Sequence, residues 1–358
     1  MNIYVSTKMR IISSISMVLV AFHHSSNLSL RYSSGDGHYD YNYNVFIQHF
    51  FGQGITRITV PVFFIISGYL FFQRITGRFS EFIPKFRKRA RSLVVPYLLW
   101  SAWGLFFFFA LQQIPQARKF FNNKLIEDFS FSEIIHTLLL DPIPYQLWFV
   151  RNLVILVAFS PLIYYVLKYL KVLPLLVLAI IYLEVVDFSF VILKRDAVLF
   201  FCFGAYLAIH KKELLLKKRD ESWYWIFPAL WLSLVTIKTI LTYQEPEETY
   251  ALFLLHKTTV LTGMASYWCA YDLLMKNKTS PNKYLLLLAS FSFFIYAFHE
   301  PVLTMIKKGI FFVTGTSDAV SLLNYFLVPT ITILLGLFIA RSLKKYTPGF
   351  YSLITGGR

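Results

Sequence analysis

The chain has 358 residues, of which 56% are hydrophobic and only 15% are charged, and its mean hydropathy is +0.55. This composition is too apolar for a soluble protein of that size and indicates a membrane protein with several spans. The formal charge of +16 does not require a nucleic-acid partner, because cytoplasmic loops of membrane proteins are enriched in Lys and Arg. Cys202 and Cys269 both lie in apolar runs, so we predict neither a disulfide framework nor a metal site.

Ten apolar runs are long enough, or nearly so, to cross a membrane, since a hydrocarbon core of about 30 Å needs a helix of about 20 residues. They cover residues 9–27, 55–73, 94–112, 147–167, 172–188, 197–210, 223–242, 250–274, 283–305 and 323–341. Backbone in lipid must satisfy its own hydrogen bonds, so we predict an all-α, polytopic protein with about ten transmembrane helices. We find no internal repeat and no appended soluble domain, and we interpret residues 1–358 as a single membrane domain.

The basic residues are distributed unevenly between the loops on the two sides of the membrane. If the N-terminus is cytoplasmic, the cytoplasmic segments hold 23 lysines and arginines, whereas the loops on the opposite side hold eight. Cytoplasmic loops carry such an excess, so both termini are predicted to be cytoplasmic.

Several predicted spans carry polar side chains near their outer ends. These residues are His23, His24, Arg57, Trp148, Arg151, Asn152, Tyr296, His299 and Glu300. Polar helix ends that meet lipid headgroups are one explanation. Ionisable groups in a membrane are costly, however, and they mark functional sites. The pairs His23-His24 and His299-Glu300 lie in otherwise apolar runs, and we therefore predict a site in the outer half of the membrane.

Two further features lie near the predicted cytoplasmic ends of the spans. The basic run 85–91 could anchor the chain to anionic lipids. It could equally bind the phosphates of a cytosolic nucleotide-bearing donor. The residues expected to do so are Arg87, Lys88, Arg89 and Arg91. The triplet 67–69, Ser-Gly-Tyr, interrupts the second run, where small residues either allow close helix packing or leave room for a slender substrate.

Six stretches occur in the same order as in a known family. They are the run that ends in His23-His24, VPVFFIISGYLFF (60–72), VVPYLLW (94–100), LWFVRNLVILVAFSPLIY (147–164), FFCFGAYLA (200–208) and SFFIYAFHEPVL (292–303). Together they resemble the membrane-bound acyltransferase-3 family, the multi-span O-acyltransferases that modify cell-surface glycans. The resemblance covers most of the chain. No single stretch is specific, and the strength of the match lies in their order.

The resemblance implies ten helices with cytoplasmic termini in a bacterial inner membrane. It implies acetyl-CoA or another acyl-CoA as the donor, a carbohydrate acceptor and no permanently bound cofactor. It also implies a catalytic histidine in the first span, preceded by an arginine at a shorter spacing than the twelve residues that separate Arg10 from His23. The arginine's role therefore falls to Arg10 from a shifted position, or to Arg57 or Arg151. The lead-in VLVAF favours His23 as the catalytic residue, whereas the following HSSN favours His24.

Acyl transfer from a thioester to a sugar hydroxyl needs a base, and imidazole is suited to that role at neutral pH. His299 could orient this base or hold the acceptor. Donors are needed for the developing oxyanion. The residues expected to provide such donors or to bind substrate are Arg57, Ser67, Gly68, Tyr69, Trp148, Arg151, Asn152, Tyr296 and Glu300. The alternative function is a transporter or flippase for a glycan or small solute. Such proteins commonly show repeats and paired broken helices, and we see neither in the sequence.

Overall fold

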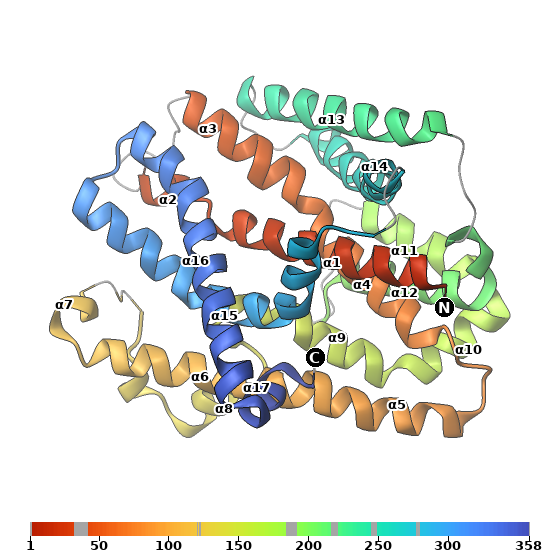
Figure 1. Cartoon of the computed structure of the whole chain (residues 1–358), viewed down its shortest axis with the longest axis horizontal. Helices are drawn as coiled ribbons and strands as arrows, with labels where there is room; N and C mark the ends of the chain where they lie inside the picture. Colours follow the sequence, from red (N-terminus) through yellow and green to blue (C-terminus); the bar gives the residue numbers. More distant parts are fainter. Residues whose placement is uncertain are drawn as a thin grey trace.

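The computed structural model describes residues 2–31, 42–119, 121, 123–183, 192–215, 221–244, 249–276 and 280–357. These residues form a bundle of helices, and none of them belongs to a β-strand. Figure 1 shows the first helix, α1 (Ile3–His24), running through the middle of the bundle from the N-terminus. The predicted all-α fold is therefore confirmed.

Helices coincide with all ten predicted runs. The long helices after α1 are α4 (Thr59–Phe72), α6 (Val95–Gln112), α9 (Trp148–Ala158), α10 (Ser160–Leu170), α11 (Leu173–Leu183), α12 (Arg195–His210), α13 (Glu221–Gln244), α14 (Tyr250–Met275), α15 (Lys283–Thr314) and α16 (Asp318–Tyr346). The short helices are α2 (Leu28–Arg31), α3 (Tyr43–Gln48), α5 (Phe82–Arg89), α7 (Pro115–Arg118), α8 (Phe131–Leu139) and α17 (Pro348–Thr355).

Six helical units among the described residues are long and apolar enough to cross a membrane, and a bent pair makes a seventh. The bent pair is α9 and α10, whose axes differ by 65°. The fourth predicted run, 147–167, is thus a broken helix rather than a straight one. Pro161, in the first turn of α10, lacks the N–H that would continue the helix through this break. The fifth predicted run extends beyond α11 into residues 184–191, which lie outside the described residues.

The predicted loop 28–54 is partly helical. Helix α3 starts at Tyr43 because the side chain of Asn42 accepts hydrogen bonds from the backbone N–H groups of Asn44 and Val45. A π-helical stretch, 49–54, and a 3₁₀ turn, Ile55–Ile58, then lead directly into α4. The second span therefore begins about three turns before the predicted residue 55, since a turn takes about 3.6 residues. The sequence did not predict this helical stretch, because the segment is too polar to be recognised as part of an apolar run.

Helices α4 and α12 touch backbone to backbone through two glycines. A Cβ added at Gly68 would overlap the carbonyl oxygen of Phe201, and one added at Gly204 would overlap that of Ile65. Small residues at a crossing allow helices to approach this closely. Gly68 therefore lies at a helix–helix contact, which is the packing alternative that the sequence left open.

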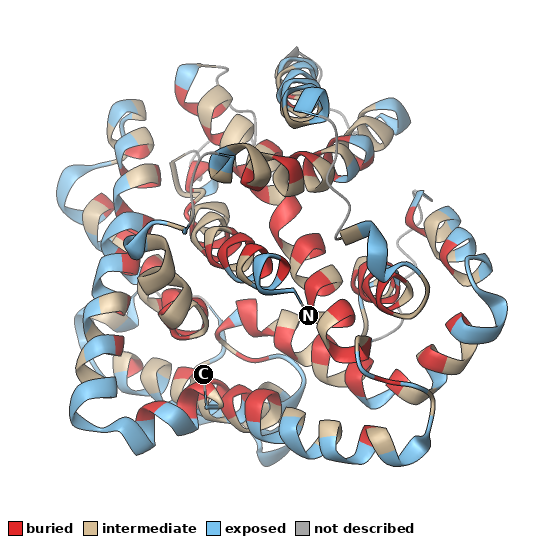
Figure 2. Ribbon diagram, turned by 45° about the vertical axis from the view of Figure 1, so that its right-hand side comes forward, coloured by how far each residue is buried: buried red, intermediate tan, exposed pale blue. Residues whose placement is uncertain are grey.

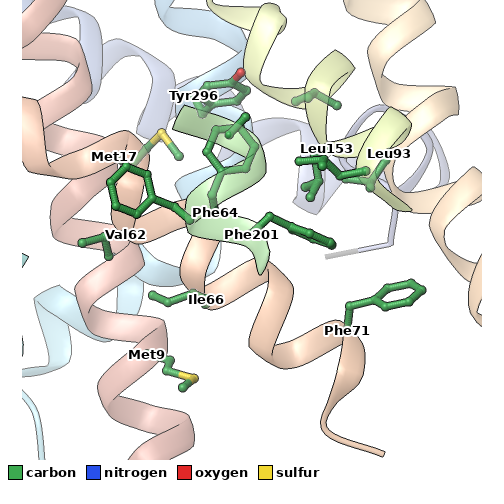
Figure 3. Packing of buried hydrophobic residues seen from close by; sticks show 14 of the residues in the cluster. Met9, Met17, Val62, Phe64, Ile66, Phe71, Leu93, Leu153, Phe201 and Tyr296 are labelled. Carbon is green, nitrogen blue, oxygen red and sulfur yellow. The ribbon is translucent and has the colours of Figure 1, made fainter. Parts of the chain in front are cut away.

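The apolar core lies where α1, α4 and α12 meet. Figure 2 shows the buried residues concentrated on the central helices and the exposed residues on the outer helices. Figure 3 shows Met17 of α1, Val62 and Phe64 of α4 and Phe201 of α12 in one packed cluster. This packed centre supports the C-terminal end of α1, where the two adjacent histidines lie.

We predict that Gly68→Leu destabilises the protein, because the new side chain must push α4 away from the backbone of α12. Overpacking of this kind costs about 1–3 kcal/mol or more. Thermal unfolding in detergent measures the loss. Gly349→Leu is the matched control, since a Cβ at Gly349 meets nothing within 4 Å. Equal melting temperatures for the two variants would contradict the close contact.

Candidate active site

Three histidine rings meet at the C-terminal end of α1. The ring of His24 stacks on the ring of His299 from α15, with centroids 5.4 Å apart and an angle of 28° between the ring planes. The ring of His23 lies edge-on to that of His24, at a centroid distance of 5.2 Å. His23 and His24 are both partly exposed, whereas His299 is buried. The structure thus brings together the predicted histidines of the first and ninth apolar runs.

The π-helical stretch before α4 holds His23 in one orientation. Nδ1 of His23 lies 3.0 Å from the carbonyl oxygen of Gly52 and 3.1 Å from the hydroxyl of Thr56. Thr56 itself donates to the Gly52 carbonyl at 2.7 Å. A carbonyl can only accept, so this network assigns the proton of His23 to Nδ1. The lone pair of His23 is then on Nε2.

A chain of polar groups connects His24 to a buried carboxylate. The hydroxyl of Tyr145 lies 2.9 Å from Nδ1 of His24 and donates to Oε1 of Glu300 at 3.2 Å. Glu300 also accepts a hydrogen bond from the hydroxyl of Thr304 at 3.0 Å. Since the Tyr145 hydroxyl uses its proton on Glu300, it accepts from Nδ1–H of His24. His24 therefore also has its lone pair on Nε2.

His299 has one bonded and one unbonded ring nitrogen. Its Nδ1 lies 2.6 Å from the carbonyl oxygen of Tyr296, so Nδ1 is the protonated nitrogen. Its Nε2 is buried and has no hydrogen-bond partner within the part of the chain that the structure describes. Buried polar atoms are rarely left without a partner, and an exception deserves a functional explanation. Here the unbonded Nε2 belongs to the ring that stacks on His24.

Helix α15 is broken at Glu300, directly before Pro301. Glu300 has extended backbone angles, φ −109° and ψ 138°. The break leaves carbonyl groups without helical partners inside the bundle, where each such group costs free energy unless another donor reaches it. The side chain of Gln146 supplies that donor, because its Nε2 bonds the carbonyls of Ala297 and Glu300, each at 3.1 Å. The break turns the Glu300 side chain toward Tyr145.

Buried polar contacts fix the chain just after the two histidines. Nζ of Lys307 donates to the carbonyls of His24 and Ser26, at 3.1 and 3.0 Å. Beyond them, the side-chain oxygen of Asn27 accepts from Gln48 at 3.0 Å and from Ser321 at 2.6 Å. These contacts join the C-terminal end of α1 and the residues after it to α3, α15 and α16. Hydrogen bonds to three other helices therefore hold the backbone that carries His23 and His24.

Two of the three arginines considered for the family's arginine, Arg10 and Arg57, lie in different places. Arg10 bonds Ser290 at 2.7 Å on α15. Its Cα lies about 20 Å from that of His23, because the thirteen-residue step along α1 rises about 1.5 Å per residue. Arg57 follows Thr56 directly and donates to the side chain of Gln53. Of these two predicted site residues, the structure places Arg57 beside the histidines and Arg10 away from them.

Several other predicted site residues make structural contacts with neighbouring segments of the protein. Asn152 accepts from the backbone N–H of Lys194 at 2.8 Å, and Arg151 donates to the carbonyl of Leu140. The hydroxyl of Tyr296 donates to the carbonyl of Gln146. The ring of Trp148 lies under Nζ of Lys194, with 4.2 Å between the nitrogen and the ring centroid.

The remaining predicted residues lie away from the histidines. Ser67, Gly68 and Tyr69 belong to the C-terminal half of α4, where Gly68 contacts α12. The predicted donor-phosphate residues lie on α5 or directly after it, and three of them are exposed. The exposed three are Arg87, Lys88 and Arg91, whereas Arg89 is partly buried.

Four residues of the site were not predicted from the sequence, namely Thr56, Tyr145, Gln146 and Lys307. Tyr145 and Gln146 lie in a proline-containing segment between two predicted spans, where aromatic residues usually indicate membrane-interface contact. Nothing in a single sequence shows that this segment folds back against α15. Lys307 lies two residues beyond the end of the predicted run 283–305, so its position in the sequence did not indicate that it belongs to the site.

Comparison with known proteins identifies the family. The model of the acyltransferase-3 family, described as an acyltransferase domain, matches residues 11–342. The chain therefore belongs to the acyltransferase-3 family, as the order of its motifs predicted. It is also 25% identical over 314 residues to the succinoglycan biosynthesis protein ExoH of Rhizobium meliloti (strain 1021). That match covers 87% of this chain and 82% of that protein. No solved structure matches the chain.

We predict that Tyr145→Phe lowers the rate of acyl transfer about fivefold, since one hydrogen bond that positions a candidate catalytic histidine is worth about 1 kcal/mol. The variant keeps the ring and removes only the hydroxyl that joins His24 to Glu300. Tyr165→Phe is the control, because Tyr165 donates to the carbonyl of Gly77 at 2.9 Å, away from the histidines. Transfer rates measured on both purified variants decide the question. If Tyr145→Phe is as active as the control, this hydroxyl does not position His24.

Proposed function

We propose that this protein is a membrane O-acyltransferase that moves an acyl group, acetyl in the first instance, from acyl-CoA to a glycan hydroxyl. Family membership supports acyl transfer. The name of the related protein ExoH, which refers to succinoglycan biosynthesis, supports a cell-surface or exported polysaccharide as the acceptor. The observation that carries the proposal is the contact chain from His24 through Tyr145 to Glu300. This contact chain orients His24 through its Nδ1 and leaves its Nε2 available to accept a proton.

In this proposal His24 acts as the general base. Its Nε2 takes the proton of the acceptor hydroxyl while the oxygen attacks the thioester carbonyl. The bond to sulfur then breaks, and the imidazolium returns the proton to the leaving thiolate, so that free CoA and the acylated glycan result. Tyr145 and Glu300 keep Nδ1 protonated and stabilise the transient positive charge, as a carboxylate does behind the histidine of a hydrolase triad.

The other groups of the cluster support this step. His23 has the same tautomer and lies next to His24, so we assign it to holding the acceptor hydroxyl. The unbonded Nε2 of His299 can accept a second hydroxyl of the sugar. Arg57 lies one residue beyond Thr56, which contacts His23, and we assign it to the developing oxyanion.

We further propose that both termini and the basic run of α5 face the cytoplasm of a bacterium, with ten spans in its inner membrane. The charge distribution between the loops supports this orientation. The histidines are then at the outer face, and the residues at 87, 88, 89 and 91 are at the inner face. Arginine and lysine clusters of this kind bind the phosphates of nucleotides such as CoA.

We predict that His24→Ala reduces acyl transfer at least about a hundredfold, the usual contribution of a positioned general base. His23→Ala should also lower the rate strongly, because His23 contacts His24. Membrane abundance and melting temperature should stay close to those of the wild type. Exposed His136 on α8 offers a control in His136→Ala. Wild-type glycan acylation by both the His23 and His24 variants would disprove the histidine mechanism.

We predict that replacing Arg87, Lys88, Arg89 and Arg91 together with Gln raises the KM for acyl-CoA by at least about tenfold, because charge-assisted contacts to phosphate are lost. The KM for the acceptor should change less. A matched control replaces exposed Lys211 and Lys212 with Gln. If the basic run is only a lipid anchor, abundance or orientation falls while the KM of the remaining protein is unchanged.

A further inference from the structure

A groove lies beside the histidine cluster and is not used by the proposed chemistry. It has a volume of about 690 Å³ and runs between the end of α6, helix α7 and the second half of α15. Figure 1 shows α6, α7 and α15 at the end of the molecule away from the N-terminus. Phe108 and Leu111 form one wall, and Met305 and Phe312 form the other. The side chain of Phe312 is largely exposed, as expected for a surface that contacts lipid chains.

The charged residues that line this groove are all positive. Lys119 and Lys308 line it, and no Asp or Glu is among the lining residues. Two other cations close to Lys119 in the sequence form ion pairs: Arg118 pairs with Glu127, and Lys124 pairs with Glu133. No carboxylate of the described residues forms an ion pair with either groove lysine. The groove therefore combines apolar walls with two cations suited to an anionic group.

One residue belongs to both the groove and the histidine cluster. Thr304 lines the groove, and its hydroxyl donates to Glu300, which accepts from Tyr145 beside His24. A molecule bound in the groove is thus separated from the cluster by the first turn of α15 after its break. Apolar walls suit a long hydrocarbon chain and two ammonium groups suit a phosphate. A substrate that projects from that phosphate would reach the histidines.

We propose that the groove binds the lipid carrier of the acceptor glycan, a polyprenyl phosphate, with its isoprenoid chain on Phe108, Leu111 and Phe312. The phosphate lies between Lys119 and Lys308, and the attached sugar extends past Thr304 toward His24. This inference rests on the proposed function, because only an acyl acceptor needs to be presented to the histidines. It specifies the acceptor as a membrane-bound glycan precursor rather than a free sugar.

The test measures binding of farnesyl phosphate, farnesol and phosphatidylglycerol to the full-length protein in nanodiscs. The wild type should bind farnesyl phosphate about tenfold more tightly than farnesol, as expected for a phosphate held by two lysines. The double variant Lys119→Ala with Lys308→Ala should abolish that preference. Gly309→Leu should weaken binding of both farnesyl compounds, because it fills the groove at a position where an added Cβ meets nothing within 4 Å and the fold should be kept. Gly349→Leu is its control and should bind as the wild type does.

Three results would overturn the inference. The wild type could bind farnesyl phosphate no better than farnesol, the lysine variants could bind as the wild type does, or phosphatidylglycerol could compete equally well. The third result would identify an ordinary site for anionic bilayer lipid. Hydrolysis of acetyl-CoA by the same wild-type preparation tests the proposed function separately. A protein that binds farnesyl phosphate as expected but never consumes acyl-CoA contradicts the proposed function and not the binding site.

Discussion

The arrangement of the three histidines depends on one constraint: polar groups inside an apolar bundle need partners. The break of α15 at Glu300 exposes two backbone carbonyls, and Gln146 satisfies both of them. Because Gln146 must reach those carbonyls, the neighbouring Tyr145 is brought against Glu300 and His24. A structural requirement of the broken helix thus assembles the contact chain that holds the candidate base.

The same constraint explains why the three imidazoles share a tautomer. Each has a backbone carbonyl or a hydroxyl that faces Nδ1, provided by Gly52, Tyr145 or Tyr296. In each ring Nε2 is the nitrogen left for a ligand or a reacting proton. Preorganised orientation of this kind lowers the reorganisation needed during reaction, and it is a general property of sites that stabilise changing charge.

The sequence predicted the helices well, and the site only in part. Long apolar runs identify helices because the membrane leaves few other backbone structures possible. The pairs His23-His24 and His299-Glu300 could be found because ionisable residues are conspicuous in such runs. Tyr145 and Gln146 could not, because their roles arise from the fold of an outer segment against α15. The early start of the second span was also missed, since the segment before it is rich in Tyr, Asn and Gly.

In the proposed mechanism, the packing of α4 against α12 limits how an acyl donor bound at α5 could reach the histidines. Along α1, Arg10 and His24 are about 21 Å apart, given a rise of about 1.5 Å per residue. A donor whose phosphates stay on the basic face of α5 must therefore extend its thioester arm through much of the bundle. The gap between α4 and α12 cannot serve, because backbone atoms of the two helices meet at Gly68 and Gly204.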